Sequence, residues 1–272
     1  MGSSPAIPSI HTEGTNWEGA ADTEQGEQQG TEFWSPLAMK VYVVLMILAV
    51  IIGTLFDVWH KGSAIYFAQR REKSKALARN PLSSGEAISL ALATIAEAAV
   101  SGEFDKTPRR ISHLLMMYGF LLNMITTFLM VFVYPTAAAT PPIVSTLWML
   151  GAAMVLVGGL WFFFFMRANV VYDGDPPWHL GRADLFVGSL IAAMAFALIW
   201  HFGQTNYPGS TAAYILFGIY MFFTTLLFVS VPWSKFAHMF FKPAVAYQRR
   251  VEEANGSSDL PRPSTQNFIV RN

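Results

Sequence analysis

The chain contains no cysteine among its 272 residues and few charges, with 13% charged against 53% hydrophobic residues. The lack of cysteine excludes disulfides, thiolate zinc sites, cysteine-held iron–sulfur clusters and covalently attached haem from this chain. The shortage of charge, together with 22 phenylalanines and 8 tryptophans, is typical of a membrane protein. Any iron–sulfur chemistry in which the chain takes part must therefore belong to a partner.

Long apolar runs divide the chain into spans. A helix needs about 20 apolar residues at 1.5 Å each to cross a hydrocarbon core of ~30 Å. A shorter, alanine-rich run at 87–100 carries Glu97, so we expect an amphipathic helix that lies at the membrane surface or against a partner. The sequence predicts an all-α integral membrane protein, a five-helix bundle over residues 37–248. The five predicted spans lie near 39–59, 111–133, 143–166, 185–202 and 211–231.

The distribution of charge predicts the orientation in the membrane. Every Lys and Arg except Lys40 lies in the first or third loop between spans or after the last span. By the positive-inside rule these segments are cytoplasmic, which places the N-terminus outside and the protein in a cytoplasmic (inner) membrane. Residues 1–36, with six acidic residues and no Lys or Arg, are expected to form a disordered outer tail. Residues 249–272 are expected to form a cytoplasmic tail, either disordered or bound to a partner.

Two histidines lie at similar depth near the cytoplasmic side. His113 begins the second span and His238 follows the fifth. Each alone has an ordinary alternative as an interfacial side chain, but two imidazoles on different helices are also the axial ligands of an electron-transferring haem b. Nearby cations are candidate partners for the haem propionates: Arg109, Arg110, Lys235 and Lys242.

The remaining histidines leave open alternatives. His201, at the end of the fourth span, suits either a hydrogen bond to a quinone carbonyl or an anchor at the membrane interface. Asp57 and His60, one turn apart, suit either a proton-accepting pair near a quinone or a salt-bridged helix end. The loop around His179 lacks the ligand count of a metal site.

Two stretches resemble a known family. They are "TIAEAAVSGEFDKTPRRISHLLMMYGFLLNMITTFLMVF" and "VPWSKFAHMFFKP". They resemble the cytochrome b membrane subunits of quinone-interacting membrane-bound oxidoreductases, and related heterodisulfide-reductase-like and nitrate reductase gamma-type subunits. The resemblance covers roughly residues 40–250. A chain of this size without an iron–sulfur domain looks most like the membrane anchor of adenylylsulfate reductase.

The resemblance implies that His113 and His238 are the axial ligands of the haem nearer the cytoplasm. Two-haem members of the superfamily carry two further histidines, at the positions of Asn123 and Tyr220 in this chain. Neither residue is a usual ligand of haem b, so one haem is expected. A second haem would have to use His60, His179 or His201 in a way that the family motif does not include.

The expected function is electron transfer between the quinone pool and a cytoplasmic iron–sulfur/flavoprotein oxidoreductase. The resemblance points to sulfur metabolism, with adenylylsulfate reductase or a heterodisulfide-reductase-like complex as the partner and no role in binding nucleic acid. The catalytic chemistry would then lie in the partner, and this chain would be a subunit without a catalytic residue. Two alternatives remain: a haem-free membrane anchor, and a small transporter. Transport is disfavoured because Asp57 is the only clear acidic residue in the spans and lies near an end.

Overall fold

The computed structural model describes the helical body of the chain. It covers residues 34–60, 62–102, 104, 106–136, 138–167, 174, 176, 178, 181, 184–231 and 238–258, the side chains of 238–241 excepted. Within these residues the chain is all-α and contains no β-strand. The predicted outer tail, apart from residues 34–36, and the last part of the C-terminal tail lie outside the described residues.

Five helices are long and apolar enough to cross a membrane, which confirms the predicted fold class. α5 begins at Thr107, earlier than expected, because Pro108 is tolerated in a first helical turn. His113 is therefore a helical residue in the second turn of α5. The five are α2 (Pro36–His60), α5 with its π-helical end η1 (Thr107–Phe128 and Leu129–Val133), α6 (Pro142–Phe165), α8 (Leu185–Asn206) and α9 (Thr211–Val229).

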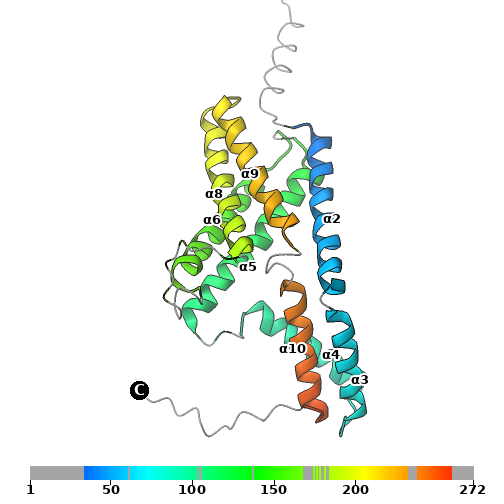
Figure 1. The fold of residues 1–272 in the computed structure, drawn as a ribbon. Helices are drawn as coiled ribbons and strands as arrows, with labels where there is room; N and C mark the ends of the chain where they lie inside the picture. Colours follow the sequence, from blue (N-terminus) through cyan, green and yellow to red (C-terminus); the bar gives the residue numbers. More distant parts are fainter. Residues whose placement is uncertain are drawn as a thin grey trace, which may run out of the picture.

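The spans pack as two antiparallel hairpins with one further helix at the edge. α5 pairs with α6, α8 pairs with α9, and α6 lies beside α8. α2 packs against α9 at the side of the bundle (Figure 1). The start of α2 and the α8–α9 turn lie at one end of the molecule, and α3, α4 and α10 gather beyond the other end (Figure 1).

The core of the bundle is formed where α6, α8 and α9 meet. It combines larger apolar side chains with Ala152 of α6 and Ala193 of α8, whose small size allows close helix packing. Its fully or nearly buried members are Ala152, Val155, Leu190, Ala193, Met194, Leu227, Phe228 and Val231.

α5 and α6 touch through their backbones. A methyl group added at Gly151 would lie 2.8 Å from the backbone nitrogen of Asn123 and from the carbonyl oxygen of Gly119. The hydroxyl of Ser112 donates to the carbonyl of Gly158 at 2.8 Å, one more contact along the same seam. This close packing fixes the rotation of α5, and with it the direction in which the side of α5 carrying His113 faces.

We predict that Gly151→Ala destabilises the bundle, because the added methyl would clash with two backbone atoms that can move only if the helices separate. Overpacking of this kind costs about 1–3 kcal/mol. The thermal unfolding midpoint in detergent should fall. Gly188→Ala on α8 is the matched control, since nothing lies within 4 Å of its added methyl. An unchanged midpoint in Gly151→Ala would contradict the close approach of α5 and α6.

Three helices lie outside the candidate spans: α3 (Ser63–Ala76), α4 (Ser84–Ala99) and α10 (His238–Asn255). α4 corresponds to the helix expected at 87–100. α3 is a helix within the first basic loop, for which the sequence predicted no helix. α10 continues past the expected boundary at 248 and ends at Asn255, because its second half is bound by α3 and α4, so the tail begins later than predicted.

α4 has a well-defined start and an uncovered apolar face. Ser83 and Glu86 form a capping box, and the bonds from the Ser83 backbone N–H and hydroxyl lower the pKa of the Glu86 carboxyl. Ile88, Leu92 and Ile95, spaced along one side of the helix, are each more than 60% exposed. We call these three residues the α4 stripe.

Candidate functional site

His113 lies half-buried on α5 and is held by the turn that follows α4. The hydroxyl of Ser101 lies 2.7 Å from Nδ1 of the imidazole. The ring of Phe104 lies against the same imidazole, with centroids 4.9 Å apart and planes inclined by 52°. Contacts at two sides of the ring fix the orientation of His113.

The start of α10 lies close to this histidine. Lys242 of α10 has its Nζ 5.7 Å from the centroid of the Phe104 ring, on which His113 also packs. His238 is the first residue of α10, one helical turn before Lys242, and its side chain is not among those described. The structure therefore brings the Lys242 side chain of α10 to the phenylalanine on which His113 packs. Lys235 lies outside the described residues.

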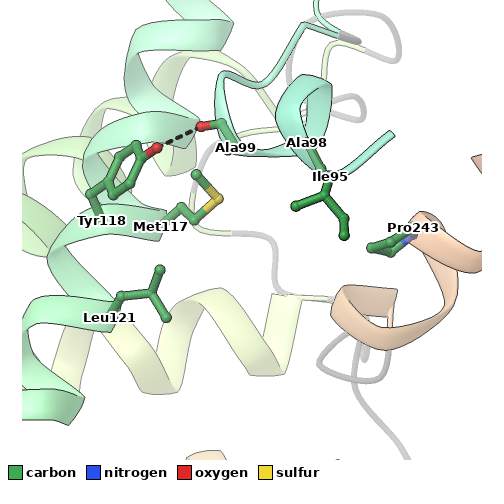
Figure 2. Close-up of a pocket in the computed structure, with 7 residues that line it drawn as sticks. All are labelled: Ile95, Ala98, Ala99, Met117, Tyr118, Leu121 and Pro243. Carbon is green, nitrogen blue, oxygen red and sulfur yellow. Dashed lines mark hydrogen bonds between the residues drawn. The ribbon is translucent and has the colours of Figure 1, made fainter. Parts of the chain in front are cut away.

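An apolar cleft of about 280 Å³ lies beside this neighbourhood. Figure 2 shows α4 and α5 side chains around it, with Pro243 of α10 opposite. The hydroxyl of Tyr118 donates to the carbonyl of Ala99 at 2.8 Å and ties α5 to the end of α4 (Figure 2). Met117 and Leu121 follow His113 at four-residue spacing, so the cleft continues along the same side of α5. It is lined by Ile95, Ala98, Ala99, Met117, Tyr118, Leu121 and Pro243.

The two candidate arginines separate in the structure. Arg110 donates from Nε to the carbonyl of Val100 at 2.8 Å, in the turn that also holds His113. Arg109 donates from Nη2 to the carbonyl of Met166 at 2.9 Å, at the end of α6. Arg110 therefore lies on the side of α5 that faces α4, whereas Arg109 reaches the other side.

The other candidate residues lie elsewhere. Asp57 is buried within α2, only 3% exposed. His60 is exposed at the end of α2, and its ring stacks on that of Phe56 with centroids 5.5 Å apart. His179 lies outside the described residues. The proposed role of Asp57 and His60 at a quinone stays a prediction.

His201 belongs to an aromatic cluster in the other half of the bundle. Its ring lies 6.2 Å from that of Trp148, and Trp200 stacks on Tyr220 at 6.0 Å. The cluster, centred on Trp148, fills the space between α6, α8 and α9 near their far ends. Its further members, joined by ring contacts, are Trp34, Tyr42 and Phe217.

Asn123 and Tyr220, the two positions considered above for a second haem, both touch Trp148. Asn123 donates from Nδ2 to the carbonyl of Trp148 at 3.2 Å. The ring of Tyr220 lies edge-on to the Trp148 indole, 6.3 Å between centroids. The indole nitrogen of Trp148 donates to the hydroxyl of Thr127 at 3.0 Å. Asn123 thus bonds the backbone of Trp148, whereas Tyr220 packs on its indole, whose polar group is hydrogen-bonded.

Sequence reasoning missed Ser101, Phe104 and Tyr118 as neighbours of the candidate site. Ser101 and Phe104 lie in the segment between α4 and α5, and only the fold of that turn brings them to His113. Their signal in the sequence was weak, because a serine before a glycine and an isolated phenylalanine are common in loops.

No family model, curated protein or solved structure matches this chain. The functional proposal therefore depends on the residues and their geometry. No cluster of three or more His, Cys, Asp or Glu that could hold a metal ion lies in the described part of the chain. A haem held between two histidines does not need such a cluster.

α10 is fastened to the other two peripheral helices by ion pairs. Arg70 of α3 grips Glu252 with two bonds, Nε to Oε1 at 2.7 Å and Nη2 to Oε2 at 2.6 Å. Glu252 is 4% exposed and also accepts from the amide of Gln248 at 3.0 Å. Arg250 pairs with Glu97 of α4. The bidentate pair acts together with hydrogen bonds at Asn255, whose carbonyl accepts from the backbone N–H groups of Arg79 and Asn80 and whose amide donates to Ser74.

We predict that Glu252→Ala releases α10, because Arg70 and Gln248 then lose a buried partner. Such a loss costs about 1–3 kcal/mol, which raises the undocked population at least about five-fold. Limited trypsin digestion should cut faster after Arg249 and Arg250.

Glu253→Ala is the matched control, since the Arg249–Glu253 pair lies on the exposed side of the same helix and contributes little. Equal cleavage in the two variants would contradict the role of Glu252.

Proposed function

We propose that this chain is a membrane-anchored haem b subunit that passes electrons between the quinone pool and a cytoplasmic oxidoreductase. One observation carries the proposal: an oriented histidine, His113, lies beside an apolar cleft whose opposite wall is the helix that begins at His238. A histidine on each of two helices and an apolar slot between them are the protein's requirements for a bis-histidine haem.

The two histidines and the apolar cleft are the kinds of groups that hold a haem b. His113 and His238 would hold the iron, and the aliphatic walls of the cleft would pack on the macrocycle. At about 280 Å³ the cleft is smaller than typical ligand pockets of roughly 300–1,000 Å³, so a porphyrin would extend beyond it, toward His113. Arg110 and Lys242 border the same region and would meet the propionates, with Arg109 and Lys235 as further candidates.

The haem would supply one-electron redox chemistry, while the protein supplies position and surroundings. Ser101 and Phe104 hold the imidazole of His113, and the glycine contacts between α5 and α6 hold the helix behind it. The apolar lining would lower the polarity around the haem, which is one of the factors that set a haem potential.

One haem is the stoichiometry that we propose. Trp148 touches both Asn123 and Tyr220, the two positions where the resembling subunits carry further ligands. A second porphyrin at that place would have to displace a buried indole that donates a hydrogen bond to Thr127. This packing supports a single haem at the end of the bundle near α4 and α10.

The quinone would exchange electrons with this haem from the same half of the bundle. Asp57 and His60, at the end of α2, remain the candidate proton-accepting groups there, and His201 the candidate on the opposite side. By the positive-inside rule, the end that carries α3, α4 and α10 faces the cytoplasm and the N-terminus faces outside. The membrane would be the cytoplasmic (inner) membrane.

The soluble partner would dock on the layer formed by α3, α4 and α10. Ile88 and Leu92 of the α4 stripe offer apolar area there, and Arg71, Lys73 and Arg79 supply positive charge on and just after α3. The family resemblance makes the partner an iron–sulfur/flavoprotein of sulfur metabolism, adenylylsulfate reductase or a heterodisulfide-reductase-like complex. A haem-free anchor would use the same surface, so it is the second candidate function.

A dithionite-reduced minus oxidised spectrum of the detergent-purified protein, with a pyridine haemochrome assay, tests the proposal. We predict one haem b per chain in the wild type and loss of haem in His113→Ala and His238→Ala, because each removes one iron ligand. His60→Ala and His201→Ala are the matched controls and should retain haem. A wild type without haem would contradict the proposal and leave the haem-free anchor as the function. Two haems per chain would contradict the role assigned to Trp148.

A further inference from the structure

The turn after α4 ends the helix in a Schellman motif. The backbone N–H of Ser101 donates to the carbonyl of Ala98 at 3.1 Å, and that of Gly102 donates to the carbonyl of Glu97 at 2.9 Å. In this motif the residue at the position of Ser101 adopts the left-handed conformation, and that residue is usually glycine. Here the glycine comes one position later.

Ser101 accordingly has a strained backbone. Its φ is +51°, and among the described residues it is the only non-glycine residue with a positive φ. A serine in this conformation brings its Cβ close to its own backbone, an energetic cost that glycine avoids. Strained residues of this kind persist where the surrounding structure fixes them, and they cluster at functional sites.

The serine side chain has a specific partner that glycine would lack. Ser101 is 1% exposed, and its hydroxyl lies 2.7 Å from Nδ1 of His113. In metal-ligating histidines the second ring nitrogen almost always donates to an oxygen, which fixes the tautomer and the plane of the ring. A hydroxyl oxygen at Nδ1 is suited to this role when iron is bound at Nε2.

We propose that Ser101 is a positioning residue that orients His113 as an iron ligand and tunes the haem through it. This inference rests on the proposed function. The Ser101 oxygen accepts the Nδ1–H bond, which makes the imidazole a stronger electron donor to iron and favours the ferric state. Ser101 has a role that glycine could not fill, because its hydroxyl makes the hydrogen bond that orients the His113 imidazole.

Two substitutions at Ser101 separate the effect of the strained backbone from the effect of the hydroxyl. Ser101→Gly relieves the positive φ and removes the hydroxyl. Ser101→Thr keeps the hydroxyl but adds a β-branch in a conformation that disfavours it. Three quantities are measured in detergent on each: the thermal unfolding midpoint, the haem midpoint potential by redox titration, and the rate of haem transfer to excess apomyoglobin.

For Ser101→Gly we expect a folded protein whose haem potential is higher than that of the wild type and whose haem affinity is about 10- to 100-fold lower. For Ser101→Thr we expect the opposite pattern, a lower unfolding midpoint with a potential close to that of the wild type. Ser83→Gly, at the other end of α4, is the matched control. It removes a serine cap from the same helix and should leave the potential unchanged.

The outcomes distinguish this inference from the function on which it rests. A wild type that carries no haem overturns both. A wild type with haem, together with a Ser101→Gly variant of unchanged potential and haem transfer rate, overturns the role of Ser101 and leaves the proposed haem site intact. A potential that shifts in Ser83→Gly as much as in Ser101→Gly would also overturn it, because the effect would then come from α4 as a whole.

Discussion

Three side-chain hydrogen bonds join α5 to residues 99–101, the turn that ends α4. Arg110 bonds Val100, His113 bonds Ser101 and Tyr118 bonds Ala99. Because the three bonds run from different positions along α5 to three adjacent residues, they fix α4 at one place along α5. α10 packs on α4, and its second half is held there by the pair of Arg250 with Glu97.

The two ends of the bundle consequently differ in what they can do. Near α4 and α10 an oriented histidine, two cations and an apolar cleft lie together. At the far end Trp148 and its aromatic neighbours occupy the interior. Under the proposed function, the haem would therefore lie at a single end, next to the helices on which a soluble partner would dock.

The sequence predicted the spans well, because a run of about 20 apolar residues is rare outside helices that cross a membrane. It did not predict α3, whose residues are mostly polar and whose helix starts after Gly62 in a left-handed conformation. It also did not predict that α10 runs to Asn255, since nothing local indicates that Glu252 will pair with Arg70 across 182 positions. His113 could be predicted as a site residue from its residue type and its depth in the membrane. Ser101 could not, because only the fold of its turn brings it to His113.

The central claim is that one iron is held by His113 from α5 and His238 from α10. Near-infrared magnetic circular dichroism of the oxidised protein tests it most directly, because the energy of the low-spin charge-transfer band depends on the pair of axial ligands. We predict a single bis-imidazole species. A histidine–methionine signature, for which Met239 follows His238 in the sequence, or a high-spin signal with an open iron position, would contradict it.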